Sequence, residues 1–158
     1  MRIVLDTNVI VSAFIKPEGN PGVILKKIFT EDSHTLLLSK GIVDELRRTL
    51  TYPKVRKCIS FSDHQINFWI TSLEMIAQDV CPRFTYNPIV LEDPKDDIYI
   101  ITAIEGNAQC IVSGDNHLLN LNPYEGIPIL KPSHFLKWAD HLSPIRAYEF
   151  HEGRTSLL

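Results

Sequence analysis

Four short runs of apolar residues, each about the length of one β-strand, recur along the 158-residue chain. They cover residues 2–5, 35–38, 110–112 and 128–130. Nearly continuous isoleucine, valine and leucine is typical of strands that are covered on both faces. Segments with helical patterns separate these runs, and strands that alternate with helices predict an α/β fold with a mainly parallel sheet.

Helices are expected between the strands, at about 23–29, 41–50, 62–79, 96–105 and 133–139, with a short one directly after Asp115. The clearest is 62–79, because Ser62 and Gln65 have the spacing of a capping box and apolar residues recur every three or four positions. Two adjacent helices between the second and third strands would form a helical arm. We expect one domain over residues 1–140 and a polar tail over residues 141–158.

The composition predicts a soluble globular protein. Hydrophobic residues make up 44% and charged residues 22% of the chain, and the formal net charge is −3. A negative charge argues against tight metal-free binding of nucleic acid, which usually depends on a basic face. The three cysteines show no CxxC spacing and fit a reducing cytoplasm. No apolar run approaches the roughly 18 residues that span a bilayer, so no membrane association is expected.

Four acidic residues occupy positions where strands end or helices run: Asp6, Glu45, Asp97 and Asp115. Taken singly, an aspartate after a strand is usually a turn residue or a helix N-cap. Jointly the pattern is more informative, because the carboxyl ends of parallel strands share one edge of the sheet, where ligands bind. We therefore expect these acids to converge although they are distant in sequence.

A cluster of carboxylates predicts a site for a divalent cation. Two carboxylates about 4 Å apart repel by roughly 4 kcal/mol at an effective dielectric constant near 20. Without a counterion such a cluster takes up protons, and a hard cation such as Mg²⁺ or Mn²⁺ removes the repulsion by binding through oxygen. Asn8 and Ser113 supply neutral oxygens beside Asp6 and Asp115, suited to orienting a carboxylate or a water.

The ordered set of motifs resembles a PIN domain over about residues 1–138. The motifs are LDTNV at 5–9, Glu45 in a mid-chain helix, DPKDD at 93–97, and VSGD at 112–115 followed by two leucines. Within that superfamily the chain is similar to the branch of toxin components of toxin–antitoxin pairs. The resemblance implies a Rossmann-like three-layer α/β/α sandwich with a central, mainly parallel sheet. It also implies a ribonuclease that depends on Mg²⁺ or Mn²⁺.

The resemblance assigns roles to individual positions. Asp6, Glu45, Asp97 and Asp115 match the acidic quartet that binds metal and carries catalysis, and Asn8 and Ser113 match its polar helpers. The family often has threonine where Ser113 stands. Asp96 competes with Asp97, which is favoured because its separation of 18 positions from Asp115 suits the family pattern. In such a site the metal lowers the pKa of a bound water and neutralises charge on the phosphodiester as hydroxide attacks in line.

The expected partners are RNA, a protein antitoxin and a second copy of the chain. A basic cluster follows Glu45, and its members Arg47, Arg48, Lys54 and Arg56 would grip RNA phosphates or simply occupy a solvated helix end. His117 is the only histidine near an acid of the quartet. Apolar positions near Phe14, Phe29 and Trp69 suit the core or a subunit interface. Two alternatives stay open: a DNA nuclease or phosphatase that uses the same acids, and a catalytically silent module that binds metal and nucleic acid.

Overall fold

The computed structural model describes residues 1–141, so the expected tail lies outside the described residues from position 142 onward. Within the described part, five strands form one parallel sheet in the order β3-β2-β1-β4-β5. They are β1 (Arg2–Leu5), β2 (Thr35–Leu38), β3 (Gln78–Asp79), β4 (Cys110–Val112) and β5 (Ile129–Leu130). The predicted α/β fold with a parallel sheet is confirmed.

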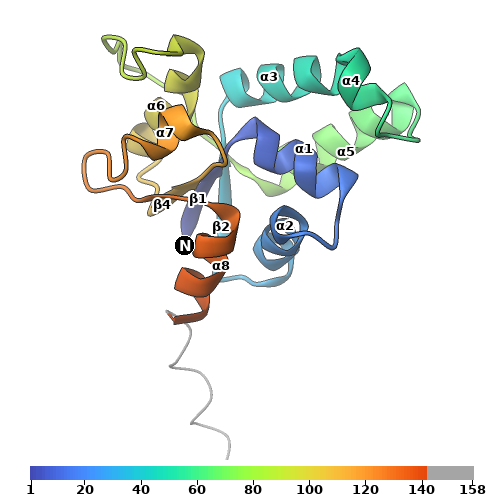
Figure 1. Ribbon diagram of the computed structural model, residues 1–158, viewed down its shortest axis with the longest axis horizontal. Helices are drawn as coiled ribbons and strands as arrows, with labels where there is room; N and C mark the ends of the chain where they lie inside the picture. Colours follow the sequence, from blue (N-terminus) through green and yellow to red (C-terminus); the bar gives the residue numbers. More distant parts are fainter. Residues whose placement is uncertain (142–158) are drawn as a thin grey trace, which may run out of the picture.

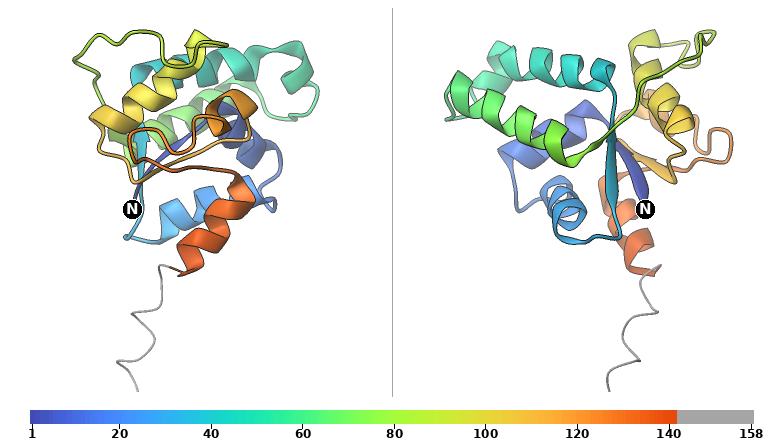
Figure 2. Two further views of the ribbon diagram at one scale, coloured as in Figure 1. Left: turned by 60° about the vertical axis from the view of Figure 1, so that its left-hand side comes forward. Right: turned by 180° about the vertical axis from the view of Figure 1, so that it is seen from behind.

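Helices cover both faces of the sheet (Figures 1 and 2). Helices α1 to α5 lie on one side, α6 and α7 lie on the other, and α8 packs against α2. Their bounds are α1 (Thr7–Ile15), α2 (Asn20–Thr30), α3 (Lys40–Thr51), α4 (Pro53–Arg56), α5 (Asp63–Ile76), the 3-10 helix η1 (Pro94–Asp96), α6 (Asp97–Glu105), α7 (Asn116–Leu119) and α8 (Pro132–His141). The molecule is therefore a three-layer sandwich.

The central strands are buried because α6 packs on one of their faces and the α1–α3 side covers the other. Ile3, Val4 and Leu5 of β1 have no exposed surface, and the side chains of β4 are equally buried. In the register, Ile3 lies opposite Leu36 of β2 and Cys110 of β4. Apolar runs without alternation therefore mark these two-sided strands, as the sequence predicts.

Local signals explain several helix ends. The capping box of α5 is present: the Gln65 backbone N–H donates to the Ser62 hydroxyl, and the Ser62 N–H donates to the Gln65 side chain. The structure corrects the expected start of the helix at 23–29, because α2 begins at Asn20. Pro21 lies in the first turn of α2, where a missing N–H costs nothing.

Three further elements differ from the expectations. The segment expected as a helix over 62–79 ends at Ile76, and Gln78–Asp79 forms the edge strand β3. Helix α1 directly follows β1 and was not expected. The short helix α4 follows Tyr52 and starts at Pro53, which is preorganised for a first helical position. Among residues 1–141, no helix has both the length and the apolar character needed to cross a bilayer.

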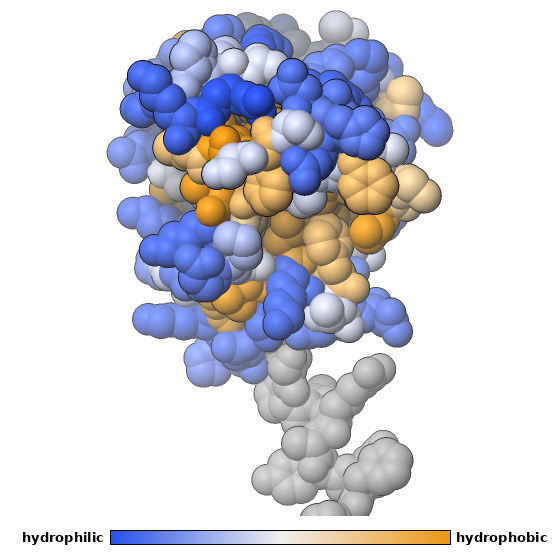
Figure 3. Space-filling view, turned by 90° about the vertical axis from the view of Figure 1, so that its right-hand side faces the viewer, coloured by the Kyte–Doolittle hydropathy of each residue, from blue (hydrophilic) through white to orange (hydrophobic). Residues whose placement is uncertain are grey.

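An apolar surface lies on the side of α1, α2 and α5 (Figure 3). Phe14 contacts Phe61 and Trp69, with ring centroids 5.1 and 4.4 Å apart. These rings, together with Leu25 and Phe29, line a groove of about 470 Å³. The aromatic positions expected in the core or at a subunit interface thus surround an open groove.

Candidate metal centre

Asp6 stands at the carboxyl end of β1, where it is the N-cap of α1. Its side chain is only 2% exposed. One carboxylate oxygen accepts the backbone N–H of Asn8 at 2.9 Å, and the other accepts the hydroxyl of Ser113 at 2.7 Å. Burial raises the pKa of Asp6, and the charge of Asp115 adds to that rise, while the bonds from Ser113 and Asn8 oppose it.

Ser113 links Asp6 to Asp115. Its hydroxyl has no exposed surface, donates to Asp6 and accepts the backbone N–H of Asp115 at 2.9 Å. Asp115 caps α7, and its carboxylate accepts the backbone N–H of His117 at 2.7 Å. The ends of β1 and β4, which pair directly, thus bring Asp6 and Asp115 to the same edge of the sheet.

The adjacent residues Asp96 and Asp97 have different surroundings. Asp97 accepts the backbone N–H groups of Ile89 at 3.2 Å and of Val90 at 2.7 Å, so its carboxylate holds the loop that precedes η1. Asp96 is half-buried, and burial is the main cause that raises its pKa to about 6. The charges of Asp93, Asp115 and Asp6 raise it further, and His117 lowers it. The charges of Asp115 and Asp6 thus act on Asp96, whereas the carboxylate of Asp97, the expected third acid, is hydrogen-bonded to the loop.

Glu45 lies in the middle of α3 and interacts with its own helix. Its carboxylate forms an ion pair with Arg48 at 2.9 Å and accepts the hydroxyl of Thr49 at 3.4 Å. The acidic charges that raise the pKa come from Asp115 for Asp6, and from Asp93, Asp115 and Asp6 for Asp96. The geometry thus places Glu45 in a local pair rather than in contact with the other acids.

Tyr99 of α6 is a part of the centre that the sequence did not indicate. It is 3% exposed, and its hydroxyl accepts the backbone N–H of Thr7 at 3.4 Å. A hydrogen bond from Tyr99 also acts on the Asp6 carboxylate and lowers its pKa. Burial, followed by the charge of Asp6, raises the pKa of Tyr99. The sequence feature that could have indicated Tyr99 is its position three residues after Asp96, because residues at this spacing lie on the same face of a helix.

A histidine and a glutamate flank the acids. The ring Nδ1 of His117 is hydrogen-bonded to Glu92, and this bond is the main cause that raises the pKa of His117. Glu92 belongs to the same loop that Asp97 holds. At the other end of that loop, Glu105 accepts the backbone N–H groups of Arg83 and Phe84 at 2.7 and 3.0 Å. Two carboxylates of α6 thus fasten the loop at two points.

Comparison with known proteins identifies the family. The model of the family described as PIN domain matches residues 2–117. This chain belongs to the PIN domain family. It is 33% identical over 121 residues to the uncharacterized protein MJ1680 of Methanocaldococcus jannaschii, a match that covers 77% of this chain and 75% of that protein. PIN domains are generally nucleases.

A solved structure has a similar fold. It is a chain in the crystal structure of VapBC2 from Rickettsia felis bound to a DNA fragment from their promoter. The TM-score is 0.53 and the identity 16%, and the match covers 82% of this chain and 97% of that chain. At this identity the similarity concerns the fold alone.

The donor set of this PIN domain suits a divalent cation. Asp6, Asp96 and Asp115 come from three segments and act on one another electrostatically. Across residues 1–141, no lysine or arginine forms an ion pair with any of the three. The same residues contain no group of three His, Cys, Asp or Glu side chains already close enough to hold an ion. Uncompensated carboxylates of this kind favour a hard cation that binds oxygen.

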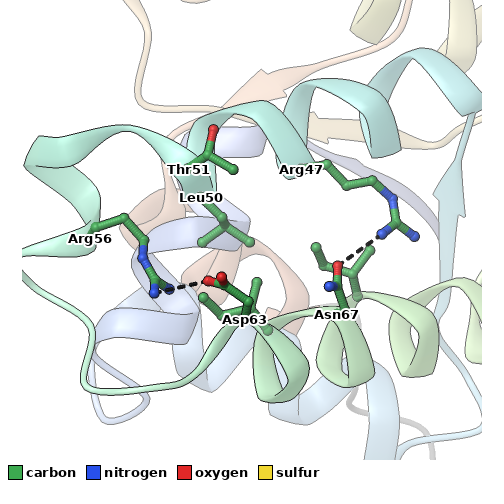
Figure 4. A pocket seen from close by; sticks show the side chains of 8 residues that line it. Arg47, Leu50, Thr51, Arg56, Asp63 and Asn67 are labelled. Carbon is green, nitrogen blue, oxygen red and sulfur yellow. Dashed lines mark hydrogen bonds and ion pairs between the residues drawn. The ribbon is translucent and has the colours of Figure 1, made fainter.

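The basic residues of the PIN domain are dispersed among different partners. Arg47 pairs with Glu74 at 2.9 Å, and Arg56 pairs with Asp63 at 3.0 Å. The two arginines line a cavity of about 540 Å³ between α3, α4 and α5 (Figure 4). Arg48 pairs with Glu45, as described above, and Lys54 is exposed on the short helix α4. Three of the four residues expected to contact RNA, all except Lys54, thus form ion pairs within the protein.

The two expected polar helpers act through different groups. Asn8 donates its backbone N–H to Asp6, while its side chain is exposed at the start of α1. Ser113 acts through its side-chain hydroxyl. Any residue except proline at position 8 could donate its backbone N–H to Asp6. The hydrogen bond from the Ser113 hydroxyl depends on the side chain, so it is the more specific of the two contacts.

Proposed function

We propose that this PIN domain is a metal-dependent ribonuclease that hydrolyses RNA phosphodiester bonds. The observation that supports the proposal best is the Ser113 hydroxyl, which joins Asp6 and Asp115 at one edge of the sheet, and the charges of both acids act on Asp96. A carboxylate cluster at the carboxyl ends of parallel strands is where an α/β fold places a ligand site. Such a cluster is costly unless a cation or protons neutralise it.

Each acid has a distinct role in this proposal. Asp6, Asp96 and Asp115 would hold Mg²⁺ or Mn²⁺, and Ser113 orients Asp6 through its hydroxyl. When bound, the ion supplies Lewis acidity that activates water and offsets charge on the phosphodiester. In this proposal Asp97, which accepts the backbone N–H of Val90, would anchor the loop rather than bind metal. Glu45 would serve as the fourth acid of the metal centre. For this its carboxylate would have to leave the ion pair with Arg48.

The proposed partners beyond RNA are a protein antitoxin and a second copy of the chain. The similar fold in VapBC2 supports the toxin–antitoxin role, and the groove around Phe14 and Trp69 offers apolar surface to a protein partner. The three cysteines are free, which supports a reducing cytoplasm as the compartment.

The test is a cleavage assay on single-stranded RNA with Mn²⁺ or Mg²⁺. Asp6→Asn and EDTA should each abolish cleavage. Single-stranded DNA and a small phosphomonoester serve as competing substrates. Preferential cleavage of DNA or release of phosphate from the monoester would replace the ribonuclease by a DNA nuclease or a phosphatase. Mn²⁺-dependent thermal stabilisation without turnover of any substrate would identify a silent binding module.

A further inference from the structure

Tyr99 occupies a buried position between α6 and the end of β1. Its ring packs in the core, while its hydroxyl reaches the turn formed by Asp6 and Thr7. A buried phenol needs a hydrogen-bond partner, and this one finds its partners at the acidic edge of the sheet. No other tyrosine in residues 1–141 is as fully buried.

The direction of the hydrogen bonds defines what the hydroxyl does. The backbone N–H of Thr7 donates to the Tyr99 oxygen, so the phenolic proton stays available for an acceptor. The Asp6 carboxylate is near enough for its charge to raise the pKa of Tyr99. That carboxylate already receives the N–H of Asn8 and the hydroxyl of Ser113. Donors from α1 and from the end of β4 thus hold the Asp6 carboxylate, while the Tyr99 hydroxyl of α6 holds the backbone of the next residue, Thr7.

We propose that Tyr99 is a positioning residue of the metal centre, whose hydroxyl fixes the Asp6–Thr7 turn so that the Asp6 carboxylate faces Asp96 and Asp115. This inference rests on the proposed function, because it assigns Tyr99 to the same centre. Helix α6 then contributes twice: Asp96 precedes its first residue, and Tyr99 lies one turn further along. Groups that orient metal ligands through hydrogen bonds typically contribute about 10–100-fold to metal affinity.

The variant Tyr99→Phe isolates the hydroxyl, because phenylalanine keeps the ring in the core. Tyr124→Phe is the matched control, since Tyr124 makes no side-chain hydrogen bond within the described residues and lies outside the centre. Mn²⁺ binding is measured without RNA, from the electron paramagnetic resonance signal of free Mn²⁺. Cleavage is measured separately as kcat and KM for RNA, at low and at saturating Mn²⁺.

The expected result is a roughly tenfold weaker Mn²⁺ affinity for Tyr99→Phe and an unchanged affinity for Tyr124→Phe. At low Mn²⁺, kcat should fall by a similar factor while KM for RNA stays the same, and excess Mn²⁺ should restore kcat. A role confined to core packing would lower the thermal stability in EDTA and would leave Mn²⁺ affinity unchanged. Equal Mn²⁺ affinities of Tyr99→Phe and the wild type would overturn the proposal.

The two proposals fail in different ways. Loss of Mn²⁺ affinity in Tyr99→Phe, combined with no RNA cleavage by the wild type, would refute the ribonuclease proposal and would still support the role of Tyr99. RNA cleavage by the wild type, combined with full activity of Tyr99→Phe at low Mn²⁺, would support the ribonuclease proposal and refute the role of Tyr99. No Mn²⁺ binding by the wild type would overturn both.

Discussion

The hydroxyl of Ser113 lies 2.7 Å from the carboxylate of Asp6, although 107 positions separate the two residues in the chain. The same hydroxyl accepts the backbone N–H of Asp115. One small side chain therefore joins the ends of β1 and β4 and aligns two acids, and several consequences of this arrangement are measurable.

Ser113→Ala should destabilise the protein by about 1–3 kcal/mol, because it leaves the Asp115 N–H and one oxygen of the buried Asp6 without a partner. Ser113→Thr retains the hydroxyl and is the matched comparison. Urea unfolding in EDTA gives the free energy of unfolding without a contribution from metal. An unfolding free energy of Ser113→Ala equal to that of the wild type would show that the two hydrogen bonds of Ser113 do not stabilise the protein.

Asp96→Ala and Asp97→Ala should separate metal binding from loop anchoring. Asp97→Ala leaves the N–H groups of Ile89 and Val90 without their acceptor and should cost about 1–3 kcal/mol of unfolding free energy, with Mn²⁺ affinity largely retained. Asp96→Ala should abolish tight Mn²⁺ binding without lowering stability in EDTA. Calorimetric titration with Mn²⁺ and urea unfolding of both variants provide the measurement. The opposite pattern would restore Asp97 as the third acid.

The stability of the metal-free protein should fall as the pH rises from about 4 to about 6. Folding raises the pKa of Asp96 from 3.8 to about 6 and also raises that of Asp6, so the folded state binds more protons in this window than the unfolded state. Each proton lost there weakens the folded state relative to the unfolded one.

Thermal unfolding in EDTA across this range tests the sign. In Asp96→Asn the decline should be smaller, because one of the titrating carboxylates is gone. Addition of Mn²⁺ at pH 7 should recover the lost stability. A melting temperature that rises steadily from pH 4 to pH 7 in EDTA would contradict the raised pKa values of Asp6 and Asp96 in the folded state.

Thr7→Val and Thr102→Val should have opposite effects on stability. Both threonines are buried, with 2% and 0% exposure. Within residues 1–141, the Thr7 hydroxyl is the one buried side-chain polar atom without a hydrogen-bond partner, whereas the Thr102 hydroxyl donates to Ser39 at 2.8 Å. Thr7→Val should be neutral or stabilising by up to about 1 kcal/mol, and Thr102→Val should cost about 1–3 kcal/mol. Equal losses in urea unfolding would refute this difference.

Much of the fold is predictable because the central strands are buried on both faces. Continuous apolar residues predict β1, β2 and β4 at their observed bounds. A strand that is covered on both faces has no side chain that points to solvent, so it needs no polar residue. The edge strand β3 escaped prediction because its two residues are exposed and polar, and only its pairing with β2 makes it a strand. Helix α1 was missed for the opposite reason, since its nearly uniform apolar sequence lacks a helical period.

The site was predictable in part for geometric reasons. Two acids that follow paired parallel strands must end at one edge, so the approach of Asp6 and Asp115 follows from the topology. Local patterns cannot decide which of two consecutive aspartates at a helix start faces that edge, because the answer depends on where the preceding loop runs. They also cannot reveal Tyr99, which reads as one more apolar position of α6 until its hydroxyl is located.

Asp96 and Asp97 are neighbours in sequence, yet their carboxylates serve two different surfaces, because successive residues of a helix project about 100° apart. A one-residue insertion or deletion between Pro94 and Asp97 would change the direction of one carboxylate relative to the other by about 100°. The loop would then lose its anchor and the acidic edge would lose its third member in a single event. The length of this stretch is therefore constrained more strictly than the identity of Lys95 within it, because both contacts depend on the same helical register.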